Sequence, residues 1–173
     1  QGNQTIYSDS LQNSWENWSW ATVNLASSSP VHGGTSSISV SSTNWQALYL
    51  HHNDQSGSGY SNLTFWINGG SVGGQSVQVQ ATRSDAPQVA VVLAPLPVNS
   101  WRQEIISLAS LGVATATDFD GFWLQVRDSG LAPTFYVDDV SLVVATNLPR
   151  GNASSAIKPN NAEVIASPTN NQM

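Results

Sequence analysis

The chain contains no cysteine, few basic residues and no long apolar run. Without cysteine it has neither disulfides nor thiolate chemistry. Its 5 Lys and Arg residues stand against 11 Asp and Glu residues, and the formal net charge is -6. Nucleic acids and anionic polysaccharides are bound by basic surfaces, which this composition does not offer. Since no run is long enough to span a bilayer either, we expect neither nucleic acid nor membrane as a partner.

The residues that are present point to one secreted domain. A length of 173 residues with 40% hydrophobic content suffices for a single buried core. Only 9% of residues are charged, so we expect an extracellular protein from which any signal peptide has been removed. Candidate N-glycosylation sequons begin at Asn3, Asn62 and Asn152, whereas the sequon at Asn17 has Trp18 in its middle position and is a poor acceptor.

The stretch Asn44–His52 alternates with the period of a β-strand. Leu48 and Leu50 occupy one face, while Tyr49 and His51 occupy the other. Similar short runs, separated by turn clusters, recur to about residue 144, which is typical of an all-β sandwich. We therefore predict a β-jelly-roll sandwich of two antiparallel sheets. Its core positions are Leu48, Leu50, Leu63, Phe65, Ile67, Val77, Val79, Phe122, Leu124 and Val126.

The expected strands end before a tail of different composition. We place strands near Thr5–Ser8, Trp18–Leu25, Ser36–Val40, Gln46–His51, Asn62–Asn68, Ser76–Thr82, Gln88–Leu93, Arg102–Ser107, Gly121–Arg127 and Thr134–Val143, and a short helical turn at Leu108–Gly112. From about Ala145 the chain is rich in Asn, Pro, Ser and Ala and has no apolar period. The predicted division is a domain of residues 1–145 and a linker or tail of residues 146–173.

Aromatic side chains share the outward phase on several of these strands. They are Trp18, Trp20, Trp45, Tyr49, Trp66 and Trp123. A row of such rings is costly to expose to water unless something flat and apolar covers it. Indoles stack on the apolar faces of pyranose rings, with roughly 1–3 kcal/mol per stack by analogy with base stacking. Trp15 and Trp101 fall outside the alternation, and we assign both to the core.

Long polar side chains share the same outward band. They are Gln78, Gln80, Gln125, Arg127 and His51. Amides offer both donors and acceptors without a charge, which suits the hydroxyl groups of a neutral sugar. Together with the aromatic residues, they predict a binding site for a neutral polysaccharide.

Asp138 and Asp139 are adjacent carboxylates inside an expected strand. Two carboxylates in such a place need compensation by a cation or by backbone donors. With Asp9 and the carbonyls of the loop His32–Ser36 they would form an oxygen shell for Ca²⁺ that ties the chain ends together. The alternative is that one Asp accepts hydrogen bonds from loop amides while the other is solvated.

Several of these segments resemble one family of binding modules. The segments are WENWSWATVNL, SPVHGGTSSISV, WQALYLHH, LTFWINGG, FDGFWLQ and FYVDDVSL. Over roughly residues 5–144 the chain resembles the jelly-roll carbohydrate-binding modules attached to secreted plant-cell-wall glycoside hydrolases, above all those beside xyloglucan- and cellulose-active enzymes. The resemblance implies a sugar cleft on the concave sheet and often a structural calcium near the chain ends, with Asp138 and Asp139 as the acidic residues of YVDD.

Two other functions stay open. Glycoside hydrolysis needs two facing carboxylates, and Glu16 and Asp128 are the candidate pair, with His51 as a base. Alternatively, the tail segment Ala156–Ser167 could add a strand to the sheet edge of a neighbouring subunit and so build a filament.

Overall fold

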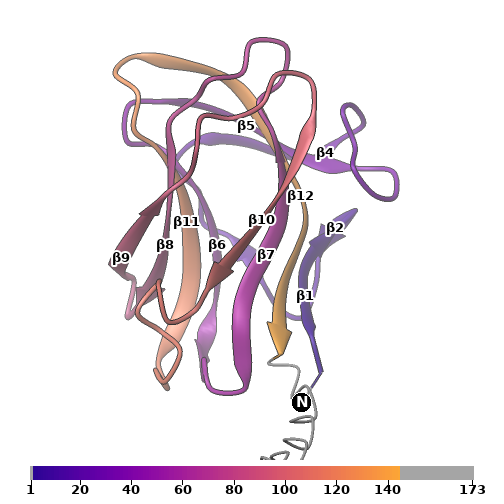
Figure 1. Ribbon diagram of the computed structural model, residues 1–173. Helices are drawn as coiled ribbons and strands as arrows, with labels where there is room; N and C mark the ends of the chain where they lie inside the picture. The colour runs from indigo at the N-terminus through magenta and orange to yellow at the C-terminus, as the bar shows by residue number, and fades with distance from the viewer. Residues whose placement is uncertain (1, 145–173) are drawn as a thin grey trace, which may run out of the picture.

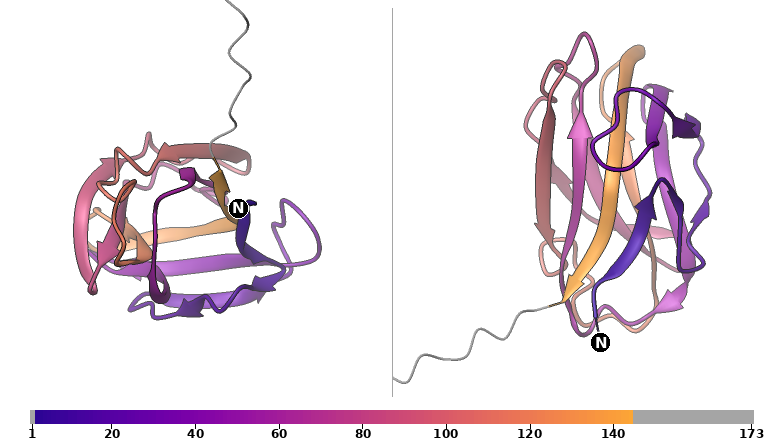
Figure 2. Two further views of the ribbon diagram at one scale, coloured as in Figure 1. Left: turned by 90° about the horizontal axis from the view of Figure 1, so that it is seen from below. Right: turned by 90° about the vertical axis from the view of Figure 1, so that its right-hand side faces the viewer.

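The computed structural model describes residues 2–144, which form two antiparallel sheets packed face to face (Figure 1 and Figure 2). The five-stranded sheet, in spatial order, contains β3 (Glu16–Asn17), β6 (Ala47–Gln55), β11 (Phe119–Val126), β8 (Val77–Arg83) and β9 (Ala86–Val92). The seven-stranded sheet contains β1 (Gln4–Ser8), β2 (Ser10–Leu11), β4 (Thr22–Ser27), β5 (Ser37–Thr43), β7 (Tyr60–Asn68), β10 (Trp101–Ser107) and β12 (Leu131–Val144). This architecture confirms the predicted sandwich.

The long strand β12 organises the seven-stranded sheet. On one side it pairs with β7, whose other neighbour is β10. On its other side it pairs first with β5 and then with β1, and β4 and β2 continue those two branches. Because Gln4 lies opposite Leu142, the start of the described chain lies beside its end (Figure 1).

The core lies between the sheets and follows the predicted alternation. All ten predicted core positions are at most 2% exposed. Burying one such side chain stabilises the fold by about 1.5–3 kcal/mol, and a slip of one residue would turn the whole set toward water. Trp15 joins them as predicted, because its ring stacks on Phe122 with centroids 5.8 Å apart.

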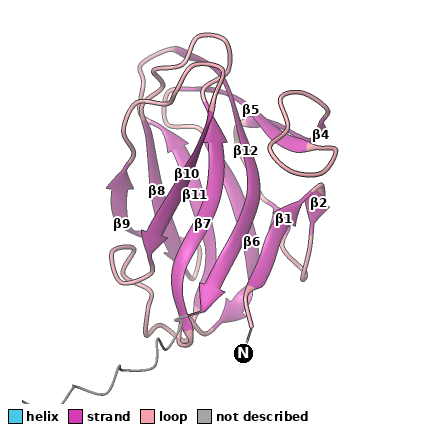
Figure 3. Cartoon of the chain, turned by 45° about the vertical axis from the view of Figure 1, so that its right-hand side comes forward, coloured by secondary structure: helices cyan, strands magenta, loops and turns pink. Residues whose placement is uncertain are grey.

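Two local predictions need correction. Trp18–Leu25 is not one strand, because β3 belongs to the five-stranded sheet and β4 to the seven-stranded sheet, and the chain crosses between the sheets at residues 18–21. Leu108–Gly112 contains hydrogen-bonded turns and no helix, and the rest of residues 2–144 is also strand and loop (Figure 3). No helix of this part of the chain could therefore cross a bilayer.

The sequons and the tail lie in different surroundings. Asn3 is exposed, and its Oδ1 accepts a hydrogen bond from the Val144 amide at 3.0 Å. Asn62 is half-buried in β7 between two neighbouring strands. Asn152, the tail and its predicted assembly strand lie outside the described residues, so self-association stays a prediction.

Candidate functional site

The outer face of the five-stranded sheet gathers most of the predicted binding residues. Trp123 of β11 lies opposite Tyr49 of β6 and Gln80 of β8, and Gln125 lies opposite Gln78. Paired residues share a face of a sheet, and their neighbours in sequence fill the core. We call this surface the aromatic face, and it consists of Trp18, Trp20, Trp45, Tyr49, His51, Gln78, Gln80, Trp123 and Gln125.

The crossing between the sheets brings Trp18 and Trp20 to this face. The Trp18 amide donates to the Tyr49 carbonyl at 2.9 Å, and the Ala21 amide donates to the Ala47 carbonyl at 3.1 Å. The segment therefore runs along the edge of β6 before it leaves for β4. Its two tryptophans are placed by backbone hydrogen bonds and not by a free loop.

Three indoles of the aromatic face are open to solvent. Trp18, Trp20 and Trp45 are 48%, 40% and 49% exposed. Hydrogen bonds fix the orientation of two of them, because Trp18 Nε1 donates to Glu16 Oε2 at 2.8 Å and Trp20 Nε1 donates to the Trp45 carbonyl at 2.9 Å. Rings that are already ordered lose little entropy when a ligand stacks on them.

The rings also support one another. Trp18 stacks on His51 with centroids 3.6 Å apart and planes 12° apart. Trp20 meets Trp123 edge-on at 4.8 Å, and Tyr49 meets Trp123 edge-on at 5.8 Å. The two edge-on contacts of Trp123 have the T-shaped arrangement that aromatic pairs prefer, whereas Trp18 lies directly over the imidazole. Half-buried Trp123 and buried Tyr49 thus form a floor beneath the exposed indoles.

Tyr49 lies across β11 at a position where only glycine fits. A Cβ on Gly121 would lie 2.5 Å from Tyr49 Cε2 and 2.7 Å from the Leu50 carbonyl oxygen. The phenol therefore passes over Gly121 and reaches the next strand, where its hydroxyl lies 3.3 Å from Thr82 Oγ1 and donates to Asp85 Oδ1 at 3.0 Å. Burial raises the pKa of Tyr49 above its usual range, so the phenol stays a donor.

A chain of amides lies beside the rings. Gln78 Nε2 donates to the side-chain oxygens of Gln80 and Gln125, both at 2.9 Å. Gln125 Nε2 donates to the Trp45 carbonyl at 2.9 Å, and Gln80 Nε2 donates to the Gln88 carbonyl at 2.8 Å. An amide nitrogen has two hydrogens, so within residues 2–144 Gln80 and Gln125 each retain a donor for a ligand.

Trp66 is not part of the aromatic face. It lies on β7 of the seven-stranded sheet, so its outward side chain faces away from the other indoles. The ring stacks on His32 at 3.9 Å, and Trp101 meets the same imidazole edge-on at 5.7 Å. The prediction that Trp66 lies beside the other binding residues is therefore wrong. Trp101 is half-buried here and is not the core residue expected.

Arg127, a predicted binding residue, is exposed just beyond the end of β11.

The expected catalytic carboxylates lie far apart. Asp128, two residues beyond β11, accepts a hydrogen bond from the Ser76 amide at 2.9 Å. Glu16 lies across β6 from Gly121, seven residues before Asp128. At about 3.3 Å per residue this separation is roughly 23 Å. The carboxyl groups of glycosidases lie about 5–9.5 Å apart, so Glu16 and Asp128 do not form such a pair.

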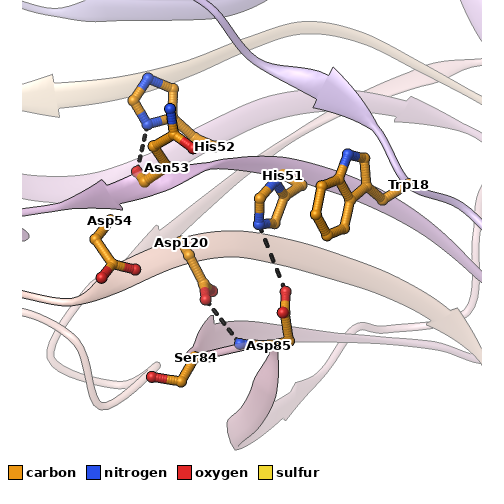
Figure 4. A pocket seen from close by; sticks show the side chains of 8 residues that line it. All are labelled: Trp18, His51, His52, Asn53, Asp54, Ser84, Asp85 and Asp120. Carbon is orange, nitrogen blue, oxygen red and sulfur yellow. Dashed lines mark hydrogen bonds and ion pairs between the residues drawn. The ribbon is translucent and has the colours of Figure 1, made fainter.

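A pocket of about 600 Å³ opens at the His51 end of the aromatic face (Figure 4). Its lining residues are Trp18, His51, His52, Asn53, Asp54, Ser84, Asp85 and Asp120. Donor atoms of His51, Asp85 and Asp120 all lie within 4.8 Å of one another, so these residues could hold a metal ion. The sequence prediction missed Asp85 and Asp120. The first occupies a turn and the second a β-bulge, and only strand pairing brings them together.

The predicted calcium ligands have different surroundings in the structure. Asp138 is fully buried and accepts hydrogen bonds from the amides of His32, Gly33 and Asp139 at 2.9, 3.2 and 2.8 Å. Burial raises the pKa of the Asp138 carboxyl despite these bonds. The loop-amide alternative therefore describes Asp138, whose oxygens already have partners.

Asp9 and Asp139 border the same loop from two sides. Asp9 accepts hydrogen bonds from the Thr35 and Ser36 amides, and these bonds hold the pKa of its carboxyl below the usual range. Asp139 Oδ2 lies 2.7 Å from His32 Nδ1. A Cβ on Gly33 would lie 2.7 Å from that same oxygen, so the loop backbone wraps closely against it. The oxygens of Asp9, Asp138 and Asp139 do not gather into one group of potential metal ligands, whereas within residues 2–144 donor atoms of His51, Asp85 and Asp120 do.

Sequence comparison finds one related enzyme. No protein-family model matches the chain. The chain is 26% identical over 144 residues to an endoglucanase from Dictyostelium discoideum, which covers 79% of this chain and 20% of the relative. The chain thus spans about a fifth of that enzyme's length.

Structural comparison finds carbohydrate-binding modules. The family 11 module of a cellulosomal cellulase of Clostridium thermocellum has a TM-score of 0.59 at 17% identity, over 83% of this chain and 95% of that module. A family 29 module in complex with mannohexaose has a TM-score of 0.55 at 15% identity, over 81% and 89%. A family 11 module with a β-1,3-1,4-mixed-linked tetrasaccharide has a TM-score of 0.53 at 16% identity, over 83% and 96%. This likeness shows the fold alone.

Proposed function

We propose that the chain is a non-catalytic module that binds a neutral β-linked polysaccharide, of the β-glucan or xyloglucan type, on the aromatic face. The observation that carries this proposal is the pair of exposed indoles of Trp18 and Trp20 on one sheet face beside a chain of amides, with exposed Trp45 in the adjoining turn. Exposed rings of this kind mark binding surfaces. Modules of the same fold bind mannohexaose and a mixed-linked glucan tetrasaccharide, which supports a sugar ligand.

The residues carry separate tasks in this proposal. The indoles would stack on pyranose faces and so supply most of the affinity. Gln80 and Gln125 would donate to hydroxyl groups, and exposed Arg127 would add a donor at the far end. Since Glu16 and Asp128 are not a catalytic pair, we propose binding without cleavage.

Affinity electrophoresis across soluble polysaccharides tests the proposal. The full chain should be retarded by at least one of cellulose derivatives, xyloglucan, mixed-linkage glucan and mannan. Trp18→Ala should migrate faster than the wild type in that gel, while Val72→Ala, an exposed apolar residue in the loop after β7, serves as the matched control. If no polysaccharide retards the wild type, the aromatic face is not a sugar site, and release of reducing ends would revive the enzyme hypothesis.

We also propose a structural calcium ion between Asp9 and Asp139, with Asp138 behind them holding the loop. Asp9 and Asp139 border the loop His32–Ser36 from two sides and so form a cradle of two carboxylates, which supports this placement. The ion would lie on the seven-stranded side and act on stability and not on sugar binding. We further propose that the protein is secreted and that, within residues 2–144, exposed Asn3 is a better glycan acceptor than half-buried Asn62.

A further inference from the structure

Asp120 is a buried carboxylate with one oxygen lacking a partner. The side chain is 3% exposed, lies on β11 and lines the pocket at the His51 end of the aromatic face (Figure 4). Its Oδ2 accepts a hydrogen bond from the Asp85 amide at 2.7 Å, whereas Oδ1 has no hydrogen-bond partner. An unpaired buried carboxylate oxygen is costly, and an ion or a water bound beside it is the usual explanation.

The neighbours of Asp120 are metal ligands by type and by distance. His51 Nε2 lies 3.5 Å from Asp85 Oδ1, and donor atoms of all three residues lie within 4.8 Å. Two ligands of a tetrahedral ion at about 2.1 Å are roughly 3.4 Å apart, so the first pair already has the required spacing. The other donor–donor distances would have to shorten by at most about 1.4 Å to reach this spacing.

Other contacts hold these ligands in place. The Tyr49 hydroxyl donates a hydrogen bond to Asp85 Oδ1 at 3.0 Å, and the Trp18 ring stacks on the His51 ring. Hydrogen bonds of this second layer typically orient metal-binding side chains. The pocket lining adds Asp54 and His52 and contains no Lys or Arg, so the part of the chain that the structure describes supplies no internal cation there.

We infer that this pocket binds a divalent transition-metal ion through His51, Asp85 and Asp120. An imidazole nitrogen with two carboxylate oxygens suits Zn²⁺ or a similar ion better than Ca²⁺, which prefers six to eight oxygens. Three protein ligands leave a coordination position open toward the pocket beside Trp18. If the aromatic face binds sugar as proposed, a sugar hydroxyl is the natural fourth ligand.

Isothermal titration of the untagged full chain with Zn²⁺, in excess Ca²⁺ to fill the calcium site, tests the inference without any sugar. One equivalent of Zn²⁺ should bind. Asp85→Asn and Asp120→Asn should each weaken that binding at least tenfold. Bound Co²⁺ should give the visible absorption of a four-coordinate site in the wild type and lose it in both variants.

Asp54→Asn is the matched control, because it removes one charge from the same pocket without removing a ligand. Its Zn²⁺ affinity should stay within about twofold of the wild type. Asp85 is an exposed side chain, so Asp85→Asn keeps the test decisive even if Asp120→Asn fails to fold. Absence of Zn²⁺ binding in the wild type, or equal losses in all three variants, would overturn the site. Since sugar is absent from this titration, failure of the polysaccharide proposal would not produce either result.

Discussion

The two outer faces of the sandwich each carry tryptophan opposite the core, yet only one of them is open. On the five-stranded sheet Trp18 and Trp20 are exposed on either side of Tyr49, and Trp45 is exposed in the adjoining turn. On the seven-stranded sheet the Trp66 ring is covered by His32, from the loop that also places its amides on Asp138. The same type of side chain in the same strand phase thus has a free surface on one face and a protein partner on the other.

This difference separates binding from stability. The loop that covers Trp66 donates hydrogen bonds to the buried Asp138 carboxylate and to Asp9, and His32 of this loop contacts Asp139. We call this part of the seven-stranded side the closed face. The aromatic face instead keeps unused donors and an unpaired oxygen of Asp120. Groups left without protein partners are those that a ligand can use. Variants on the aromatic face should therefore lose sugar affinity, whereas variants on the seven-stranded side should lose stability.

The largest effect should come from Gly121→Ala, because it displaces Tyr49, which lies beneath the exposed indoles of the aromatic face. The new methyl group would meet the Tyr49 ring and the fixed Leu50 carbonyl. Overpacking of this kind costs about 1–3 kcal/mol of unfolding free energy, and the displaced Tyr49 should also reduce sugar affinity. Urea unfolding and affinity electrophoresis measure the two effects. Gly2→Ala, with no atom within 4 Å of its Cβ, should change neither; wild-type behaviour of Gly121→Ala would contradict the described Tyr49 position.

Trp20→Ala and Trp66→Ala compare the two faces directly. Trp20→Ala should lower oligosaccharide affinity about tenfold to a hundredfold, which corresponds to about 1–3 kcal/mol for a lost stack, with little change in Tm. Trp66→Ala should leave affinity unchanged and lower Tm, because it uncovers His32. Titration calorimetry and thermal unfolding of both variants decide the matter. Loss of affinity in Trp66→Ala would show that the faces are not separate.

Trp66 shows which part of the candidate site could be predicted from the sequence and which part could not. Alternation identified Leu63, Phe65 and Ile67 as core residues and Trp66 as an outward one, because the residues of a strand themselves show which of its two faces is buried. Which sheet a strand joins depends on pairing with strands far along the chain, and β7 pairs with β10 and β12 and not with β6. The fold class was therefore predictable, whereas the full membership of the aromatic face was not.

The pocket residues escaped prediction for a related reason. Asp85 lies in the turn between β8 and β9, and Asp120 lies beside the irregular register at Gly121. Neither has a neighbour in sequence that indicates a ligand. Their approach to His51 depends on β11 lying between β6 and β8, which no local pattern records. For Asp138, by contrast, the sequence raised the loop-amide alternative that the structure shows.

Calcium removal should affect the closed face alone. At free Ca²⁺ tenfold above its dissociation constant, a bound ion stabilises the fold by about 1.4 kcal/mol. Chelation should therefore lower the Tm of the wild type by a few degrees without changing its sugar affinity. Asp139→Asn should abolish the shift, and Trp20→Ala should retain it. An unchanged wild-type Tm after chelation would remove the proposed ion from the Asp9–Asp139 cradle.

The smallest expected effect is an acid dependence that Asp9 contributes on the closed side. Amides of Thr35 and Ser36 hold its folded-state pKa below the usual value, so Asp9 stabilises the fold above its unfolded pKa of about 3.9. That contribution is lost as pH falls through the lower folded-state pKa. In chelator, the difference in Tm between wild type and Asp9→Asn should therefore be largest above about pH 5 and should shrink toward pH 2. The control Asp54→Asn removes an exposed carboxylate on the open side and should give no such convergence. If the two variants follow the same pH profile, the amide bonds to Asp9 do not stabilise its charged form, and the closed face owes its stability to other contacts, such as the stack of His32 on Trp66.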